Sequence, residues 1–101
     1  MTELRIDVGL QRNRYIFQLH PNSRHFLDSN YPDSPRTDSL VLSYWNQHTI
    51  EQLSNGNWLN IFSLVTGLSP SQLEQFDDIV VYDPHPNKLV YQLRPEHVTT
   101  H

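Results

Sequence analysis

Residues 66–78, "TGLSPSQLEQFDD", decide how the middle of the chain folds. Ser69 is followed directly by Pro70 and, three positions on, by Gln72. A serine with a glutamine three residues later forms a capping box, in which the two side chains bond backbone N–H groups at the start of a helix. Proline suits the first helical position because it has no N–H to satisfy. We therefore predict a short helix that begins after Ser69 and ends near Asp77.

A second helix is predicted immediately before this one, over residues 58–66. Its apolar residues recur at i, i+3, i+4 and i+7, which places them on one helical face, and Leu59 and Leu64 widen that face. Asn57 is the expected N-cap, and Gly67 is the expected end because glycine readily adopts the left-handed conformation that closes helices. The four residues of the stripe are Trp58, Ile61, Phe62 and Val65.

A third helix is predicted over residues 48–54, with the Asn55-Gly56 pair as its stop signal. Residues 21–39 contain three prolines and many serines, asparagines and aspartates. These residue types restrict φ or bond their own backbone, so we expect a long irregular loop there. Residues 95–101 are expected to be a frayed tail.

Strands are predicted toward both ends of the chain, where apolar and polar residues alternate with the period of a half-buried strand. Residues 4–10, "LRIDVGL", and residues 14–20, "RYIFQLH", form a first hairpin, for which Gly9 to Asn13 can supply the turn. Residues 40–45 form a third strand. Residues 79–83 and 88–93 flank a proline-containing turn and form a second hairpin.

This order of elements predicts one small α+β domain over residues 1–101. It comprises an N-terminal β-hairpin plus a third strand, three short central helices and a C-terminal β-hairpin, with an antiparallel sheet packed on the helices. The chain has no cysteine, so disulfide and thiolate chemistry are excluded. We expect no secretory signal and no membrane span, and hence a cytoplasmic protein.

Residues 58–76 resemble a helix-turn-helix, with Gly67 in the turn and apolar residues at the family's spacing. Followed by residues 79–94 as a wing, they resemble a winged-helix DNA-binding protein. That resemblance implies that the second helix reads DNA, with Gln72 and Gln75 as its base-reading side chains.

Charge argues against this alternative, because affinity for nucleic acids comes largely from lysine and arginine. Residues 37–87 contain neither lysine nor arginine. The same segment contains six acids and therefore carries a formal charge of −6, within a chain of net charge −4. The acids are Asp38, Glu51, Glu74, Asp77, Asp78 and Asp83. DNA binding then requires the early arginines (Arg5, Arg12, Arg14, Arg24 and Arg36) to fold beside the second helix.

A second alternative is a small histidine-based or metal-dependent enzyme. The chain has six histidines, at His20, His25, His48, His85, His97 and His101. A zinc site needs three or four ligands in fixed geometry, and the local spacings supply only pairs. Ser69 lacks the second glycine of a nucleophile elbow. We therefore predict no catalytic residue, no cofactor and no metal ligand.

The remaining hypothesis is a non-enzymatic protein-interaction or regulatory module with an acidic central and C-terminal face. Exposed aromatic residues are enriched at protein interfaces, and open strand edges accept partner strands. The expected partner is another protein or a second copy of this chain, and nucleic acid and membrane are not expected. The candidate partner-binding residues are Tyr44, Trp45, Glu74, Asp77, Asp78, Tyr82 and Tyr91.

Overall fold

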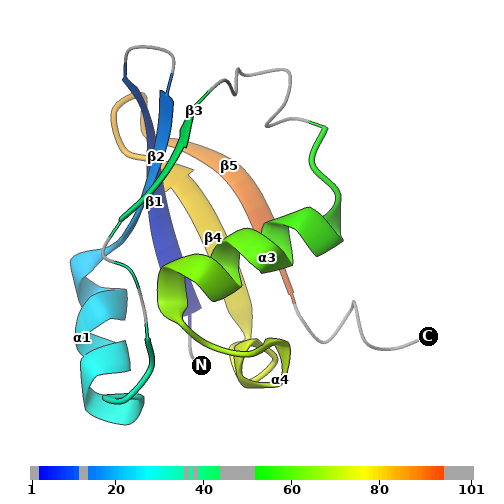
Figure 1. Cartoon of the computed structure of the whole chain (residues 1–101). Coiled ribbons are helices and arrows are strands. Elements are labelled where there is room, and N and C mark those ends of the chain that lie inside the picture. Colours follow the sequence, from blue (N-terminus) through cyan, green and yellow to red (C-terminus); the bar gives the residue numbers. More distant parts are fainter. Residues whose placement is uncertain (1–2, 12–13, 36, 38, 44–51, 95–101) are drawn as a thin grey trace.

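The computed structural model describes residues 3–11, 14–35, 37, 39–43 and 52–94. It is an α+β protein, as predicted (Figure 1). Its strands are β1 (Glu3–Gln11), β2 (Arg14–Leu19), β3 (Ser39–Ser43), β4 (Asp78–Asp83) and β5 (Lys88–Leu93). Its helices are α1 (Pro21–Asn30), α3 (Asn55–Thr66) and α4 (Pro70–Leu73).

The five strands form one mixed sheet in the order β3-β2-β1-β4-β5. Both predicted hairpins are present, because β1 pairs with β2 and β4 pairs with β5 in antiparallel fashion. The central pair, however, is parallel, with Leu4 opposite Ile79 and Ile6 opposite Val81. The prediction of an antiparallel sheet is therefore wrong at this pair.

The path of the chain explains the parallel pair. β3 runs in the same direction as β1, since each is antiparallel to β2. From the end of β3 the chain returns across one face of the sheet through α3 and α4, and it enters β4 parallel to β1. Parallel neighbours require such a crossover rather than a tight turn.

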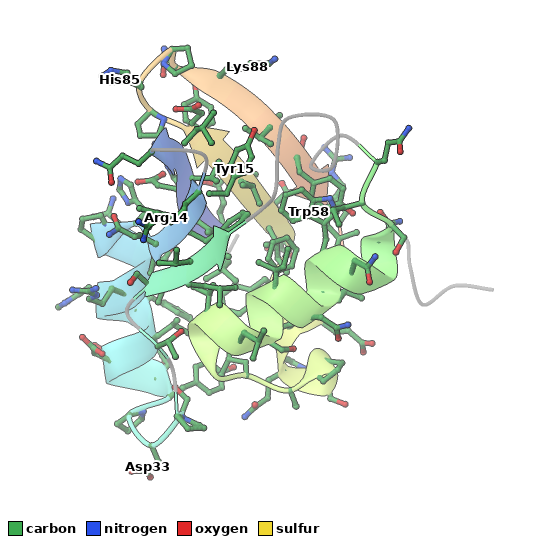
Figure 2. All side chains as sticks on the ribbon, turned by 45° about the horizontal axis from the view of Figure 1, so that its top comes forward. Arg14, Tyr15, Asp33, Trp58, His85 and Lys88 are labelled. Atoms are coloured by element: carbon green, nitrogen blue, oxygen red, sulfur yellow. The ribbon has the colours of Figure 1, made fainter. Side chains whose placement is uncertain are left out.

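One hydrophobic core lies between the sheet and α3, which crosses in front of the strands in Figure 1. The stripe predicted on this helix is confirmed, since Trp58, Ile61, Phe62 and Val65 are all buried. Figure 2 shows Trp58 between α3 and the strands. Its ring lies edge-on to the ring of Phe17, and the two ring centroids are 6.0 Å apart. Burial of such side chains stabilises the fold by about 1.5–3 kcal/mol each.

The ends of α3 confirm one predicted cap and correct another. Gly67 closes the helix with φ of 74°, and its N–H donates to the Ser63 carbonyl at 2.8 Å. The N-cap is Ser54 rather than Asn57, because the Ser54 hydroxyl accepts the Asn57 N–H at 3.2 Å. The Asn55-Gly56 pair therefore begins α3 instead of ending an earlier helix. Leu64, which was expected to widen the buried stripe, is 56% exposed.

The predicted capping box at the start of α4 is confirmed. The Gln72 N–H donates to the Ser69 hydroxyl at 3.3 Å, and the Ser69 N–H donates to the Gln72 side-chain oxygen at 3.0 Å. The helix ends at Leu73, earlier than the predicted Asp77, and so comprises a single turn.

Helix α1 corrects the prediction of an irregular loop over residues 21–39. Pro21 occupies its first turn, and the His20 ring nitrogen accepts the Asn22 N–H. Contacts far apart in sequence hold the helix in place: the Arg5 N–H donates to the buried Ser23 hydroxyl at 2.8 Å, and Phe26 contacts the Phe76 ring. Tertiary packing thus overrides the low helix propensity of this serine- and asparagine-rich segment.

Several predicted features fall on residues outside the described part of the chain. They are the last two residues of the strand predicted over 40–45, most of the helix predicted over 48–54, and the tail 95–101. Residues 52–54, the described end of that predicted helix, are not helical. Among the described residues, no helix is long and apolar enough to cross a membrane.

Candidate functional site

The sheet has one face on the side of α3 and α4 and one face turned away from them, which we call the open face. The strand register aligns five residues in a row across the whole of the open face: Ser39, Gln18, Asp7, Tyr82 and Leu89. Because side chains alternate along a strand, these five project from the side opposite Trp58 and the core. The row therefore forms the middle of a surface that spans every strand.

The next row toward the β1–β2 turn, which we call the row above, contains Val41, Ile16 and Gly9. Val41 is 46% exposed, and Gly9 is also exposed. A Cβ atom placed on Gly9 would meet nothing within 4 Å, so the space above this strand is open.

The row below contains Arg5, Val80 and Gln92. The Arg5 guanidinium donates through Nε to Asp7 at 2.9 Å and lies 4.6 Å from the centre of the Tyr82 ring. The Tyr82 hydroxyl in turn donates to the Asn87 side-chain oxygen at 2.8 Å. These bonds fix polar side chains from three segments in one place on the open face.

Two adjoining hollows lie over this face, and Asp7 and Gln18 line both of them. The lower hollow, of about 470 Å³, is walled by α1 through Arg24, His25 and Asp28. The upper hollow, of about 580 Å³, lies between residues 8–11 of β1 and the turn that joins β4 to β5. Figure 2 shows His85 and Lys88 at this turn. Together the hollows form a groove that runs from α1 to the β4–β5 turn.

The groove is broad and open to solvent, unlike a small-molecule pocket, which encloses most of its ligand. Within the described ranges, no three histidine, aspartate or glutamate side chains are grouped so that they could hold a metal ion. The surface is suited to contact with a macromolecule, because it offers hydrogen-bonding groups, ring faces and apolar side chains over several strands.

Two of the candidate partner-binding residues lie on the open face. Tyr82 is at its centre, and Asp78 is two rows below, where its carboxylate accepts from Gln92 and Arg94 at 3.2 Å. Glu74 and Asp77 are exposed near the end of α4, just before β4 begins.

Tyr91 lies on the other side of the sheet, against the core. Its ring stacks on Trp58 at 4.6 Å and lies 6.2 Å from Phe62. Its hydroxyl donates to the Asn55 side-chain oxygen, and burial raises the pKa of this tyrosine above its ordinary value. Tyr91 is thus a structural residue of the helix-covered face. Tyr44 and Trp45 lie outside the residues that the structure describes.

The sequence interpretation placed Gly9 in the turn of the first hairpin, whereas the structure places it within β1. It missed Gln18 and the residues of the β4–β5 turn. Its own alternation pattern contained the signal, because the period that puts Arg5 and Asp7 on one side of β1 puts Gly9 beside them. What the pattern lacks is the register that brings Gln18 and Tyr82 into the same row as Asp7.

The arrangement of α3, α4 and the last hairpin gives no support to the winged-helix alternative. α4 has four residues, which is too short to lie along a DNA groove as recognition helices do. β4 is bonded on both sides, to β1 and to β5, so the hairpin is part of the central sheet. Arg14 is the first residue of β2. The start of β2 and α4 lie toward opposite ends of the sheet (Figure 1).

Comparison with protein-family models, with curated proteins and with solved structures finds no match to this chain.

Proposed function

We propose that this chain is a non-enzymatic protein-interaction module that binds a protein partner through the open face of its sheet. The observation that carries the proposal is the groove on that face, which is walled by α1 and by the β4–β5 turn. This groove is open to solvent and extends over several strands, which suits contact with a protein partner.

Three features of the open face support the proposal. The Arg5–Asp7–Tyr82 cluster presents fixed hydrogen-bonding and aromatic groups, which lose little conformational freedom when a partner binds. Val41 and Leu89 add exposed apolar surface at its two sides, with exposed fractions of 46% and 45%. At one end of the face, Asp78 accepts from Gln92 and Arg94, which adds further fixed polar groups to this surface.

Capture from an extract of the native host tests this proposal, with three baits compared by quantitative mass spectrometry. They are the unmodified protein, Gln18→Arg in the middle of the groove, and Asn60→Arg on α3 as the matched control. Gln18 and Asn60 are both exposed amides, so neither substitution should unfold the protein.

We expect a host protein that the unmodified and Asn60→Arg baits retain and that the Gln18→Arg bait loses by about tenfold, equivalent to about 1.4 kcal/mol. Equal recovery on all three baits, or loss only with Asn60→Arg, contradicts the assignment of the open face. Retention of duplex DNA at moderate salt, with a steep dependence on salt concentration, would replace the proposal with the DNA-binding alternative.

A further inference from the structure

Strand β1 is longer than the part of it that pairs with β4. The β1–β4 register ends where Asp7 lies opposite Tyr82, whereas pairing with β2 continues to Gln11. Among the described residues, no strand lies beside residues 8–11 on the β4 side. β4 departs at this point because the prolines of the following turn have no N–H with which to continue a ladder. The upper hollow lies over the open face next to this gap, between β1 and the turn.

A strand edge of this kind is a binding feature in its own right. Its backbone N–H and C=O groups have no strand partner on one side, and an extended segment of another chain satisfies them by joining the sheet. The chemistry of the edge therefore selects a peptide in extended conformation, because neither a helix nor a small molecule offers a matching row of backbone groups.

Gly9 lies in the middle of this edge, and the fold itself gives no reason for a glycine there. Of the described glycines, only Gly67 has a positive φ, so the backbone at Gly9 is one that any residue adopts. No atom lies within 4 Å of where its Cβ would be, so internal packing does not exclude a side chain either. A glycine inside a strand often marks a place where another backbone approaches closely.

The charges of the hollow indicate what kind of segment fits. Among the residues that line it, Asp7 and Asp83 are the charged ones. Arg5 binds one oxygen of Asp7, and Asp83 accepts the His85 N–H. Its lining thus contains two carboxylates, one of them paired with Arg5, and no lysine or arginine, within a chain whose net charge is −4. This charge favours a basic partner and disfavours a second copy of the same acidic chain.

We infer that the gap beside β1 binds an extended segment of the partner protein that carries lysine or arginine. The segment adds as a strand along residues 8–11, and the long side chain of its lysine or arginine lies across Gly9 on the open face. This inference rests on the proposed interaction function and names the part of the partner that is recognised.

Fluorescence anisotropy with three labelled hexapeptides tests the inference. The probes are Lys-Val-Lys-Val-Lys-Val, the matched Glu-Val-Glu-Val-Glu-Val, and the lysine peptide N-methylated at every internal amide. Each is titrated with the unmodified protein, with Gly9→Val and with the control Gly56→Val. Gly56 is exposed at the start of α3, and a Cβ there meets only the Ser54 hydroxyl at 3.9 Å.

We expect the lysine peptide to bind, and the acidic and N-methylated peptides to bind at least about tenfold more weakly. Gly9→Val should weaken binding of the lysine peptide by a similar factor, while Gly56→Val leaves it within about twofold. Melting curves of both variants check that they are folded.

Four outcomes would overturn the inference. The first is that the lysine peptide does not bind at about millimolar concentration. The second is that the N-methylated peptide binds as tightly as the lysine peptide, and the third is that the lysine peptide binds Gly9→Val as tightly as the unmodified protein. The fourth is that light scattering shows a dimer of the unmodified protein that Gly9→Val abolishes. The first three leave the interaction function intact if capture still depends on Gln18, so the two proposals fail separately.

Discussion

Replacement of Gly9 by alanine is expected to stabilise the free protein. Glycine inside a strand is less stable than alanine by about 0.5–1 kcal/mol, since it loses more backbone freedom on folding. That gain is available at Gly9 because its φ is not positive and its Cβ position is empty to 4 Å. The free energy of unfolding should therefore rise by about 0.5–1 kcal/mol, which corresponds to about 2–8 °C in melting temperature for a domain of this size.

Gly67→Ala is the matched control, and it should have the opposite effect. At φ of 74°, Gly67 holds the left-handed conformation that ends α3. An L-residue in that conformation is strained by about 1–2 kcal/mol, and the reduced freedom of the unfolded chain offsets about 0.5 kcal/mol of this. We expect the free energy of unfolding to fall by about 1 kcal/mol.

Urea unfolding at 25 °C measures both changes, provided that the slope of free energy against urea concentration is unchanged. The reasoning is refuted if Gly9→Ala lowers the free energy of unfolding by more than about 0.5 kcal/mol, because a side chain would then be in conflict with the fold. The glycine would have a structural explanation, and its use as evidence for a binding edge would be lost.

Three further predictions concern the helices and the aromatic core. Ser69→Ala removes the N-cap of α4 and should lower the free energy of unfolding in urea by about 1 kcal/mol, whereas Ser71→Ala in the same turn should change it by less than about 0.5 kcal/mol. Thr66→Val should cost about 1–3 kcal/mol in the same assay, because the buried Leu68 N–H loses its acceptor; a change below about 0.5 kcal/mol would contradict this role. Since burial raises the pKa of Tyr91, the folded state holds the phenol proton more tightly than the unfolded chain does. The resulting contribution to the free energy of unfolding is present below pH 10.0 and is lost as the pH rises above it. Thermal melts from pH 9 to 12 should thus decline more steeply for the unmodified protein than for Tyr91→Phe, and parallel curves would contradict the burial of this hydroxyl.

The elements with a strong local signal could be predicted from the sequence. The alternation in β1 and β2 reports burial on one face, and the structure buries Leu4, Ile6 and Phe17 completely. The capping box at Ser69 depends only on residues within one turn, so no tertiary information was needed to find it.

The parallel pairing of β4 had a signal that the interpretation did not use. Ile79, Val80 and Val81 are three consecutive apolar residues, and all three are buried. A continuous apolar run is typical of a parallel strand in the middle of a sheet, whereas an antiparallel strand with one wet face alternates. β5, which lies at the sheet edge, also has three consecutive apolar residues, Leu89, Val90 and Tyr91, but none of them is fully buried.

Helix α1 and the open face could not be predicted in this way, because both depend on distant contacts. α1 is held by bonds such as that from the Arg5 N–H to Ser23, 18 residues away in sequence. The central row of the open face, likewise, exists only because the register places Gln18 and Tyr82 on either side of Asp7.

Photo-cross-linking in host extract tests most directly whether the open face is the partner-binding surface. The photoreactive residue p-benzoylphenylalanine is placed at Val41 on the open face or at Leu64 on α3, two apolar side chains of comparable exposure, 46% and 56%. We predict that the Val41 position gives a cross-linked adduct with a host protein and that the Leu64 position does not. An adduct from Leu64 with none from Val41 would place the partner on the helices and contradict the account.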